Sequence, residues 1–138
     1  MHAGLRASGP KADLALVIAD EPASAAGVFT KNVMAAAPVA FCKAALAASP
    51  SGTARAVLVN AGQANAATGA AGAADCEASA AALKAALPAA SAPGDILLLS
   101  TGVIGRRIKL DALAAALPAL VSGAGPGPAD AHHAAVAI

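Results

Sequence analysis

Aromatic side chains are almost absent from this 138-residue sequence, which contains Phe29 and Phe41 but no tryptophan and no tyrosine. Large aromatic rings supply much of the buried area of a typical protein core. Alanine makes up about a third of the residues, and each alanine contributes only one methyl group. We therefore expect closely packed helices and strands around a thin core, with little stability to spare.

Strong charge and a cysteine framework are also missing. The formal net charge is +1, so no strong field attracts nucleic acid or a membrane surface, and no basic stripe alternates with aromatic residues. The hydrophobic content of 58% excludes a disordered chain. Cys42 and Cys76 are too few for a disulfide scaffold, so we expect both thiols to be reduced and buried.

Long apolar runs are interrupted. The uncharged stretches 56–74 and 112–129 contain polar residues, glycines or prolines, and neither supplies the roughly 20 apolar residues of a spanning helix. The first residues lack the charged segment and apolar block of a secretory signal. These absences predict a soluble domain inside the cell or an organelle, with no membrane or nucleic-acid partner.

Short apolar runs bounded by turn residues indicate strands. Strands are predicted over residues 13–20, 25–30, 55–60 and 95–100, with a further short segment at 38–42. The first two runs are joined by a short loop that contains an acid–proline pair, which favours an antiparallel hairpin.

Longer patterns with a period near 3.6 residues indicate helices. The face of the first helix consists of residues at spacings of four, three and four, namely Cys76, Ala80, Leu83 and Leu87. Pro88 ends this helix. A second helix begins near Leu110 and contains Pro118, which we expect to kink or remove its last turn. Asp130 is predicted to be the N-cap of a final helix, 131–138. The alternation of strands and helices predicts an α/β or α+β fold.

Two loops that follow predicted strands carry small polar residues, and such loops are common places for functional sites. The loop Asn60–Gly69 has no lysine after its second glycine and spells no dinucleotide fingerprint, so its amides are interpreted as partners of local backbone groups. In the loop Ser100–Gly105, glycine lets backbone N–H groups turn toward a ligand and stabilise negative charge on a carbonyl oxygen. An ordinary strand-to-helix turn is the alternative for this second loop.

The remaining polar clusters point to no catalytic machinery of their own. Arg106, Arg107 and Lys109 attract a carboxylate substrate in one interpretation and form a solvated face in the other, which we favour. His132 and His133 are adjacent, so on a helix they point about 100° apart and do not form a zinc site. Spacing alone therefore nominates no metal ligand and no nucleophile.

The order of several longer segments carries more information than any single motif. Four segments occur in sequence: GLRASGPKADLALVIADEPASAAGVFTKN at 4–32, AAPVAFCK at 36–43, AVLVNAGQANAATG at 56–69 and STGVIGRRIK at 100–109. Together they resemble the N-terminal part of the ornithine acetyltransferase family, the ArgJ proteins of arginine biosynthesis, and most closely its plant and green-algal branch. The resemblance covers nearly the whole chain. It implies a partial αββα sandwich, with residues 1–138 forming the N-terminal part of an α chain and no second domain.

The resemblance also implies an activity and a site. Family members are ornithine acetyltransferases and glutamate N-acetyltransferases, which move an acetyl group from N-acetylornithine to glutamate. Some members also take it from acetyl-CoA, and no metal or other cofactor is implied. The precursor cleaves itself, and the threonine at the N-terminus of the resulting β chain is the nucleophile. The oxyanion hole of the family maps onto Thr101 and Gly102.

The resemblance further implies a heterotetramer of two α and two β chains. It places the protein in the chloroplast, with the cytoplasm or mitochondrion as alternatives. Family members continue beyond both ends of this sequence, and the nucleophile lies after Ile138, so we expect residues 1–138 alone to be an inactive fragment. Two other functions stay open, a self-processing aminopeptidase of similar fold and a non-catalytic module that binds metabolites or partner chains.

Overall fold

The computed structural model describes residues 1–7, 9–90 and 92–138. Its elements follow one another along the chain as β1 (Leu14–Ser24), α1 (Ala37–Ala48), β2 (Thr53–Gln63), α2 (Gly69–Ala86), the 3₁₀ turn η1 (Pro88–Ala90), β3 (Ile96–Val103), α3 (Leu110–Ser122) and α4 (Pro128–Val136). This mixture of helices and strands confirms the predicted fold class. No helix in the described ranges is long and apolar enough to cross a membrane.

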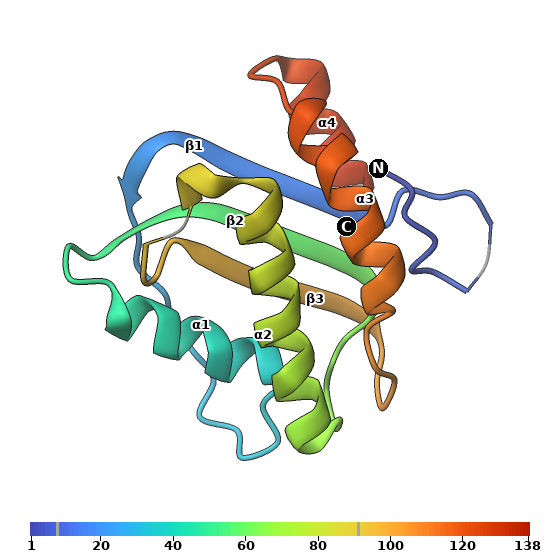
Figure 1. The fold of residues 1–138 in the computed structure, drawn as a ribbon. Coiled ribbons are helices and arrows are strands. Elements are labelled where there is room, and N and C mark those ends of the chain that lie inside the picture. The colour runs from blue at the N-terminus through green and yellow to red at the C-terminus, as the bar shows by residue number, and fades with distance from the viewer. Residues whose placement is uncertain (8, 91) are drawn as a thin grey trace.

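The three strands form one sheet in the order β1-β2-β3, with β1 antiparallel to β2 and β2 parallel to β3 (Figure 1). The helix α2 connects the two parallel strands, as a crossover connection between such strands must. In the register of this pair, Asn60 lies opposite Ser100 and Gly62 lies opposite Gly102. The two polar segments singled out in the sequence therefore meet at the same end of the sheet.

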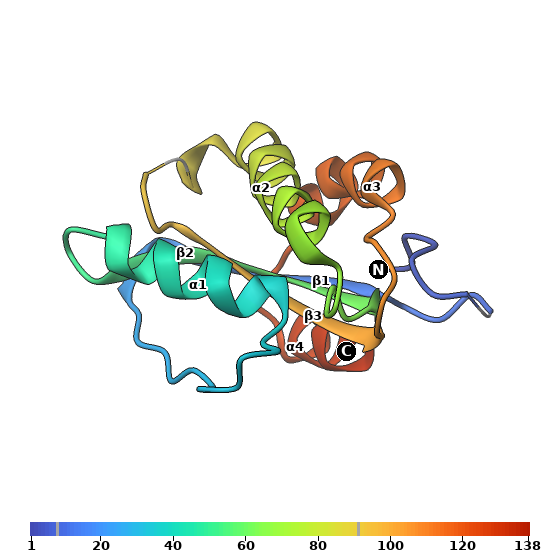
Figure 2. The same ribbon diagram turned by 90° about the horizontal axis from the view of Figure 1, so that it is seen from below.

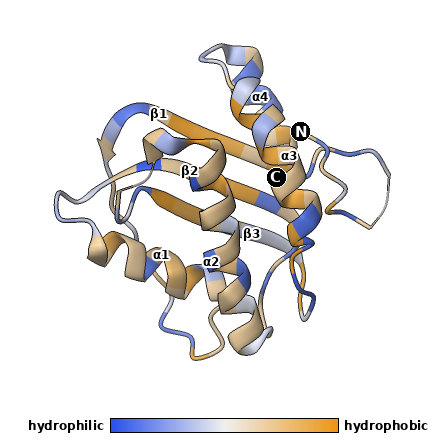
Figure 3. Cartoon of the chain, in the orientation of Figure 1, coloured by the Kyte–Doolittle hydropathy of each residue, from blue (hydrophilic) through white to orange (hydrophobic). Residues whose placement is uncertain are grey.

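Helices cover the two faces of the sheet unequally. Figure 2 shows α2 and α3 on one face and α4 on the other, while α1 packs against β3 and α2. The main core lies under α2 and α3, and its fully buried large side chains are Leu5, Leu14, Leu83, Leu113 and Leu117. In Figure 3 the most apolar colours lie along stretches of the three strands. On α2 the predicted buried face is confirmed for Cys76, Ala80 and Leu83, and Leu87 is partly buried.

The predicted hairpin is wrong. Residues 25–30 form no strand, and the Val28 side chain there is fully exposed. Instead, β1 continues to Ser24 and pairs with β2, with a register shift between Ile18 and Ala23. The pairing with β2 satisfies the hydrogen bonds of β1 on that edge, so the adjacent run 25–30 is not needed as a partner. The segment 38–42 lies in α1, where Pro38 occupies the first turn that tolerates proline.

At the ends of two helices the structure rules out one of the two expected effects of Pro118, removal of the last turn, and the predicted N-cap at Asp130. Pro118 lies inside α3, which continues to Ser122, so the last turn is present. The neighbouring Leu117 is only 1% exposed, and its burial holds this part of the helix against the sheet despite the missing N–H group. In α4 the N-cap is Gly127 rather than Asp130. Asp130 caps from within the first turn, where its carboxylate accepts a hydrogen bond from the Gly127 N–H at 3.1 Å. Both cysteines are free and buried, as predicted.

Candidate active site

Thr101 and Gly102 lie in the last residues of β3 rather than in the loop that the sequence predicted. Thr101 is opposite Ala61 and Gly102 is opposite Gly62, so pairing with β2 carries the strand further than its apolar run. Both residues are exposed. The candidate site therefore sits on a hydrogen-bonded strand end, which positions it more firmly than a free turn would.

The backbone at Gly102 requires glycine for two independent reasons. Its φ angle is +126°, a conformation that L side chains rarely adopt. A Cβ atom there would also lie 2.5 Å from the carbonyl carbon of Gly62. Gly62 in turn has no room for a Cβ, which would meet the carbonyl carbon of Leu5 at 2.8 Å. The backbones at Gly102, Gly62 and Leu5 are thus packed closely against one another, in that order.

The segment behind Gly62 is held by the buried carboxylate of Asp13. This carboxylate accepts hydrogen bonds from the N–H groups of Ala3 at 2.5 Å, Leu5 at 2.6 Å and Arg6 at 3.0 Å. Burial alone raises the pKa of Asp13, but these three hydrogen bonds and the nearby His2 outweigh burial and leave the pKa below its ordinary value of 3.8. The ionised carboxylate therefore organises the N-terminal segment.

The candidate site has two hydrogen-bond donors, and the sheet geometry sets the direction of one of them, the Gly102 N–H. The N–H of Leu98 donates to the Cys42 sulfur on α1 at 3.2 Å, on the edge of β3 that faces away from β2. Backbone groups alternate between the two edges of a strand, so the Gly102 N–H points to the same open edge. The hydroxyl of Thr101 has no hydrogen-bond partner among the described residues. One backbone N–H and one hydroxyl are thus available where β3 ends.

The loop Asn60–Gly69 is shorter than predicted, because β2 extends to Gln63. Its amides bind local backbone groups, as the sequence indicated: Asn60 donates to the Gln63 carbonyl at 2.9 Å and Asn65 donates to the Gly72 carbonyl at 2.8 Å. Gln63 reaches further and donates to the Leu5 carbonyl at 2.6 Å. These bonds tie the end of β2 to α2 and to the N-terminal segment.

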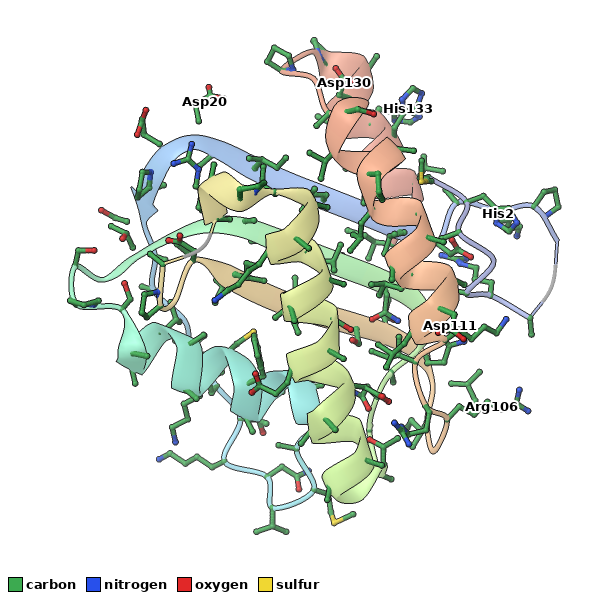
Figure 4. All side chains as sticks on the ribbon, in the orientation of Figure 1. His2, Asp20, Arg106, Asp111, Asp130 and His133 are labelled. Carbon is green, nitrogen blue, oxygen red and sulfur yellow. The ribbon has the colours of Figure 1, made fainter. Side chains whose placement is uncertain are left out.

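The cationic residues Arg106, Arg107 and Lys109 after β3 are all exposed, as the solvated-face interpretation predicts, but two of them also bind other parts of the chain. Arg107 pairs with the buried carboxylate of Asp75 on α2, with its terminal nitrogen 2.6 Å from Oδ1, and this hydrogen bond raises the pKa of Arg107. Lys109 donates to the Gly4 carbonyl at 2.7 Å. Figure 4 shows Arg106 at the periphery, beyond the end of β3.

Sequence reasoning missed the role of Asp75, the buried partner of Arg107. Asp75 is fully buried, as is Leu83 eight residues later on the same helical face. The eight-residue spacing between Asp75 and Leu83 was the signal in the sequence that could have indicated the burial of Asp75. The adjacent His132 and His133 lie on α4, with ring centroids 6.4 Å apart. Within the described part of the chain, no three acidic, histidine or cysteine side chains gather in a way that could hold a metal ion.

A family model for the ArgJ family matches residues 1–138. The chain belongs to the ArgJ family. Among its relatives, the chloroplastic arginine biosynthesis bifunctional protein ArgJ of Physcomitrium patens is 56% identical over the whole chain, and that of Ostreococcus lucimarinus is 57% identical over 99% of it. The chain spans 26% and 29% of the length of these two relatives.

Solved structures of the ArgJ family share the fold. The ornithine acetyltransferase of Mycobacterium tuberculosis, determined in complex with ornithine, matches with a TM-score of 0.90 and 41% identity, covering the whole chain and 72% of that structure. The ArgJ protein of Bacillus halodurans matches with a TM-score of 0.76 and 30% identity over 86% of the chain and 59% of that structure. The family resemblance seen in the sequence and the ArgJ-like fold class are both confirmed.

Proposed function

We propose that this ArgJ chain is part of an enzyme that transfers an acetyl group from N-acetylornithine to glutamate, with acetyl-CoA as a further acetyl donor. In this proposal the chain supplies the oxyanion hole from the Thr101 hydroxyl and the Gly102 N–H. The observation that carries the assignment is the glycine-only backbone of Gly102 at the open end of β3, next to a Thr101 hydroxyl that has no hydrogen-bond partner in the described part of the chain. The names of the relatives support the pathway and the reaction class.

The chemistry follows from where negative charge develops. The nucleophile attacks the acetyl carbonyl carbon, and the electron pair of the C=O bond moves to oxygen, where the two donors stabilise it. Collapse of this intermediate releases ornithine, whose nitrogen takes up a proton, and leaves the acetyl group as an ester. The amine of glutamate then attacks the ester and releases the nucleophile as an alcohol.

The nucleophile in this proposal is the N-terminal threonine of a β chain cleaved from the same precursor, and its freed amine accepts the hydroxyl proton. From the resemblance to the ArgJ family we also propose a heterotetramer of two α and two β chains. The names of the plant and algal relatives support a chloroplast location. Residues 1–138 without the β chain should show no turnover of N-acetylornithine.

A chimera tests the proposed reaction. Residues 1–138 replace the matching segment of the Physcomitrium patens relative, and the unmodified relative is assayed in parallel. We expect the purified chimera to form ornithine and N-acetylglutamate. Peptide hydrolysis without acetyl transfer would replace the proposal with the aminopeptidase function, and metabolite binding without turnover would replace it with a binding module.

The oxyanion role is tested at Thr101 in the same chimera. Thr101→Ala should lower kcat about 10²-fold, because one of the two donors to the developing charge is lost. Thr101→Ser keeps the hydroxyl and is the matched control, with kcat expected close to that of the unmodified chimera. An unchanged kcat in Thr101→Ala would remove Thr101 from the oxyanion hole.

A further inference from the structure

Asn65 is a buried amide in an unusual backbone conformation. Its side chain is fully buried, and its φ angle is +48°. Among the described residues, Asn65 and Ala67 are the two non-glycine residues with a positive φ. Asparagine tolerates this region better than most residues, but the conformation persists only where surrounding contacts hold it. The hydrogen bonds of Asn65 therefore identify the contacts that stabilise this backbone conformation.

The side chain of Asn65 is held by the first turns of α2. Its Nδ2 donates to the Gly72 carbonyl at 2.8 Å and to the Cys76 sulfur at 3.3 Å, and its Oδ1 accepts a hydrogen bond from the Thr68 hydroxyl at 2.7 Å. A Cβ on Gly72 would lie 2.4 Å from that Oδ1, so glycine there leaves room for the amide. The backbone carbonyl of Asn65 accepts a bond from the Ala37 N–H at the start of α1, at 3.1 Å.

The residues on both sides of Asn65 bind the end of β3. The Ala64 N–H donates to the Val103 carbonyl at 3.0 Å, and the Ala66 carbonyl accepts a bond from the Gly105 N–H at 2.8 Å. These partners lie one and three residues after Gly102. The conformation at Asn65 thus sets the register between the loop after β2 and the chain that leaves the oxyanion site.

We propose that Asn65 is a positioning residue for the oxyanion site. It holds residues 64–66 so that their backbone groups clamp Val103 and Gly105, and the clamp sets where the Gly102 N–H and the Thr101 hydroxyl point. The Asn65 side chain is fully buried, so it can influence the site only through this clamp. The inference rests on the proposed function, because it concerns donors to the acetyl oxygen.

Two variants separate the side chain from the backbone conformation. Asn65→Gly keeps the left-handed backbone accessible but removes all three side-chain hydrogen bonds. Asn65→Asp keeps the shape and the acceptor for Thr68 but loses the donor to the Gly72 carbonyl. In the acetyl-transfer chimera, both should lower kcat about 10-fold or more, since small misplacements of positioned groups cost up to about 10² in rate. KM should change less than about twofold, because ground-state binding is left intact.

Ser79→Ala is the matched control for lost stability. It removes another buried hydrogen bond on α2, from the Ser79 hydroxyl to the Asp75 carbonyl at 2.7 Å, without touching the clamp. Its kcat should stay within about twofold of the unmodified chimera. If Ser79→Ala lowers kcat as much as the Asn65 variants do, general destabilisation explains the loss and the positioning role is overturned.

A double-mutant cycle distinguishes positioning from an independent structural effect. If Asn65 acts through the oxyanion donors, Asn65→Gly should cost much less in a Thr101→Ala background than in the unmodified chimera. Losses that simply multiply, or a normal kcat in both Asn65 variants while Thr101→Ala is slow, would overturn the positioning role but keep the proposed function. A normal kcat in Thr101→Ala itself would overturn both, because there would be no Thr101 donor to position.

Discussion

Replacing Gly102 with alanine should disable the site through backbone displacement rather than loss of a functional group. The new Cβ would lie 2.5 Å from the Gly62 carbonyl carbon, whereas ordinary van der Waals contact begins at 3.4 Å. The colliding atom belongs to the backbone of a central strand and cannot rotate away. The ends of β2 and β3 must therefore separate by the difference, about 0.9 Å. Because a misplacement of about 1 Å can cost about 10² in rate, we expect kcat to fall about 10²-fold, or about 2.7 kcal/mol in transition-state stabilisation.

The acetyl-transfer chimera provides the assay, with kcat measured at saturating N-acetylornithine and glutamate. Gly52→Ala is the control, because Gly52 also has a positive φ of +64°, a Cβ there would meet nothing within 4 Å, and it lies before β2, away from the site. That variant carries the backbone strain without the collision. If Gly102→Ala keeps kcat within about threefold of Gly52→Ala, the close approach to Gly62 does not position the site and the reasoning is refuted.

Three further predictions concern buried charges and thiols. Arg107→Ala should lower the urea midpoint of unfolding more than Arg106→Ala does, because it leaves the buried Asp75 carboxylate without its cation, whereas Arg106 is an exposed surface residue. The pKa of Asp13 lies below 3.8 in the folded state, so its contribution to stability is present above about pH 4 and is lost as the pH falls through the folded pKa; Asp13→Asn should flatten that part of the pH–stability profile. Burial raises the pKa of Cys76 from 9.0 to about 11, so thiol labelling of the native chain at pH 8 should be about 10²-fold slower than in urea.

Each of these predictions has a result that would contradict it. Equal urea midpoints for the Arg107 and Arg106 variants would mean that water replaces the ion pair. A pH–stability profile that keeps its slope in Asp13→Asn would assign the acid sensitivity to other carboxylates. Equally fast labelling of native and unfolded protein at Cys76 would mean that the thiol is accessible in the folded chain.

Local pattern predicted most of the elements and the region of the site. The spacing of Cys76, Ala80 and Leu83 predicted the buried face of α2, and the apolar runs before Asn60 and Ser100 predicted β2 and β3. These predictions succeed because a helix or strand with one buried face has apolar residues at regular spacings within a short stretch of sequence. The ordered motifs also indicated the ArgJ family before the fold was known.

Contacts between distant residues were beyond the reach of local pattern. The partner of β1 is β2 and not the adjacent run 25–30, because strand pairing is decided by which edges meet in space. Asp75 and Arg107 are 32 residues apart, and neither one indicates in isolation that they form a pair.

The sequence by itself determined the fold class, the family and the two glycine-containing segments that form the candidate site. The tertiary structure decided how those segments meet: Gly102 lies against Gly62, 40 positions earlier, and the residues beside Asn65 bind the chain just after Gly102. The physical reason is that an oxyanion site depends on the direction of backbone N–H groups. That direction is set by strand register and close backbone packing, which no single segment of the chain contains.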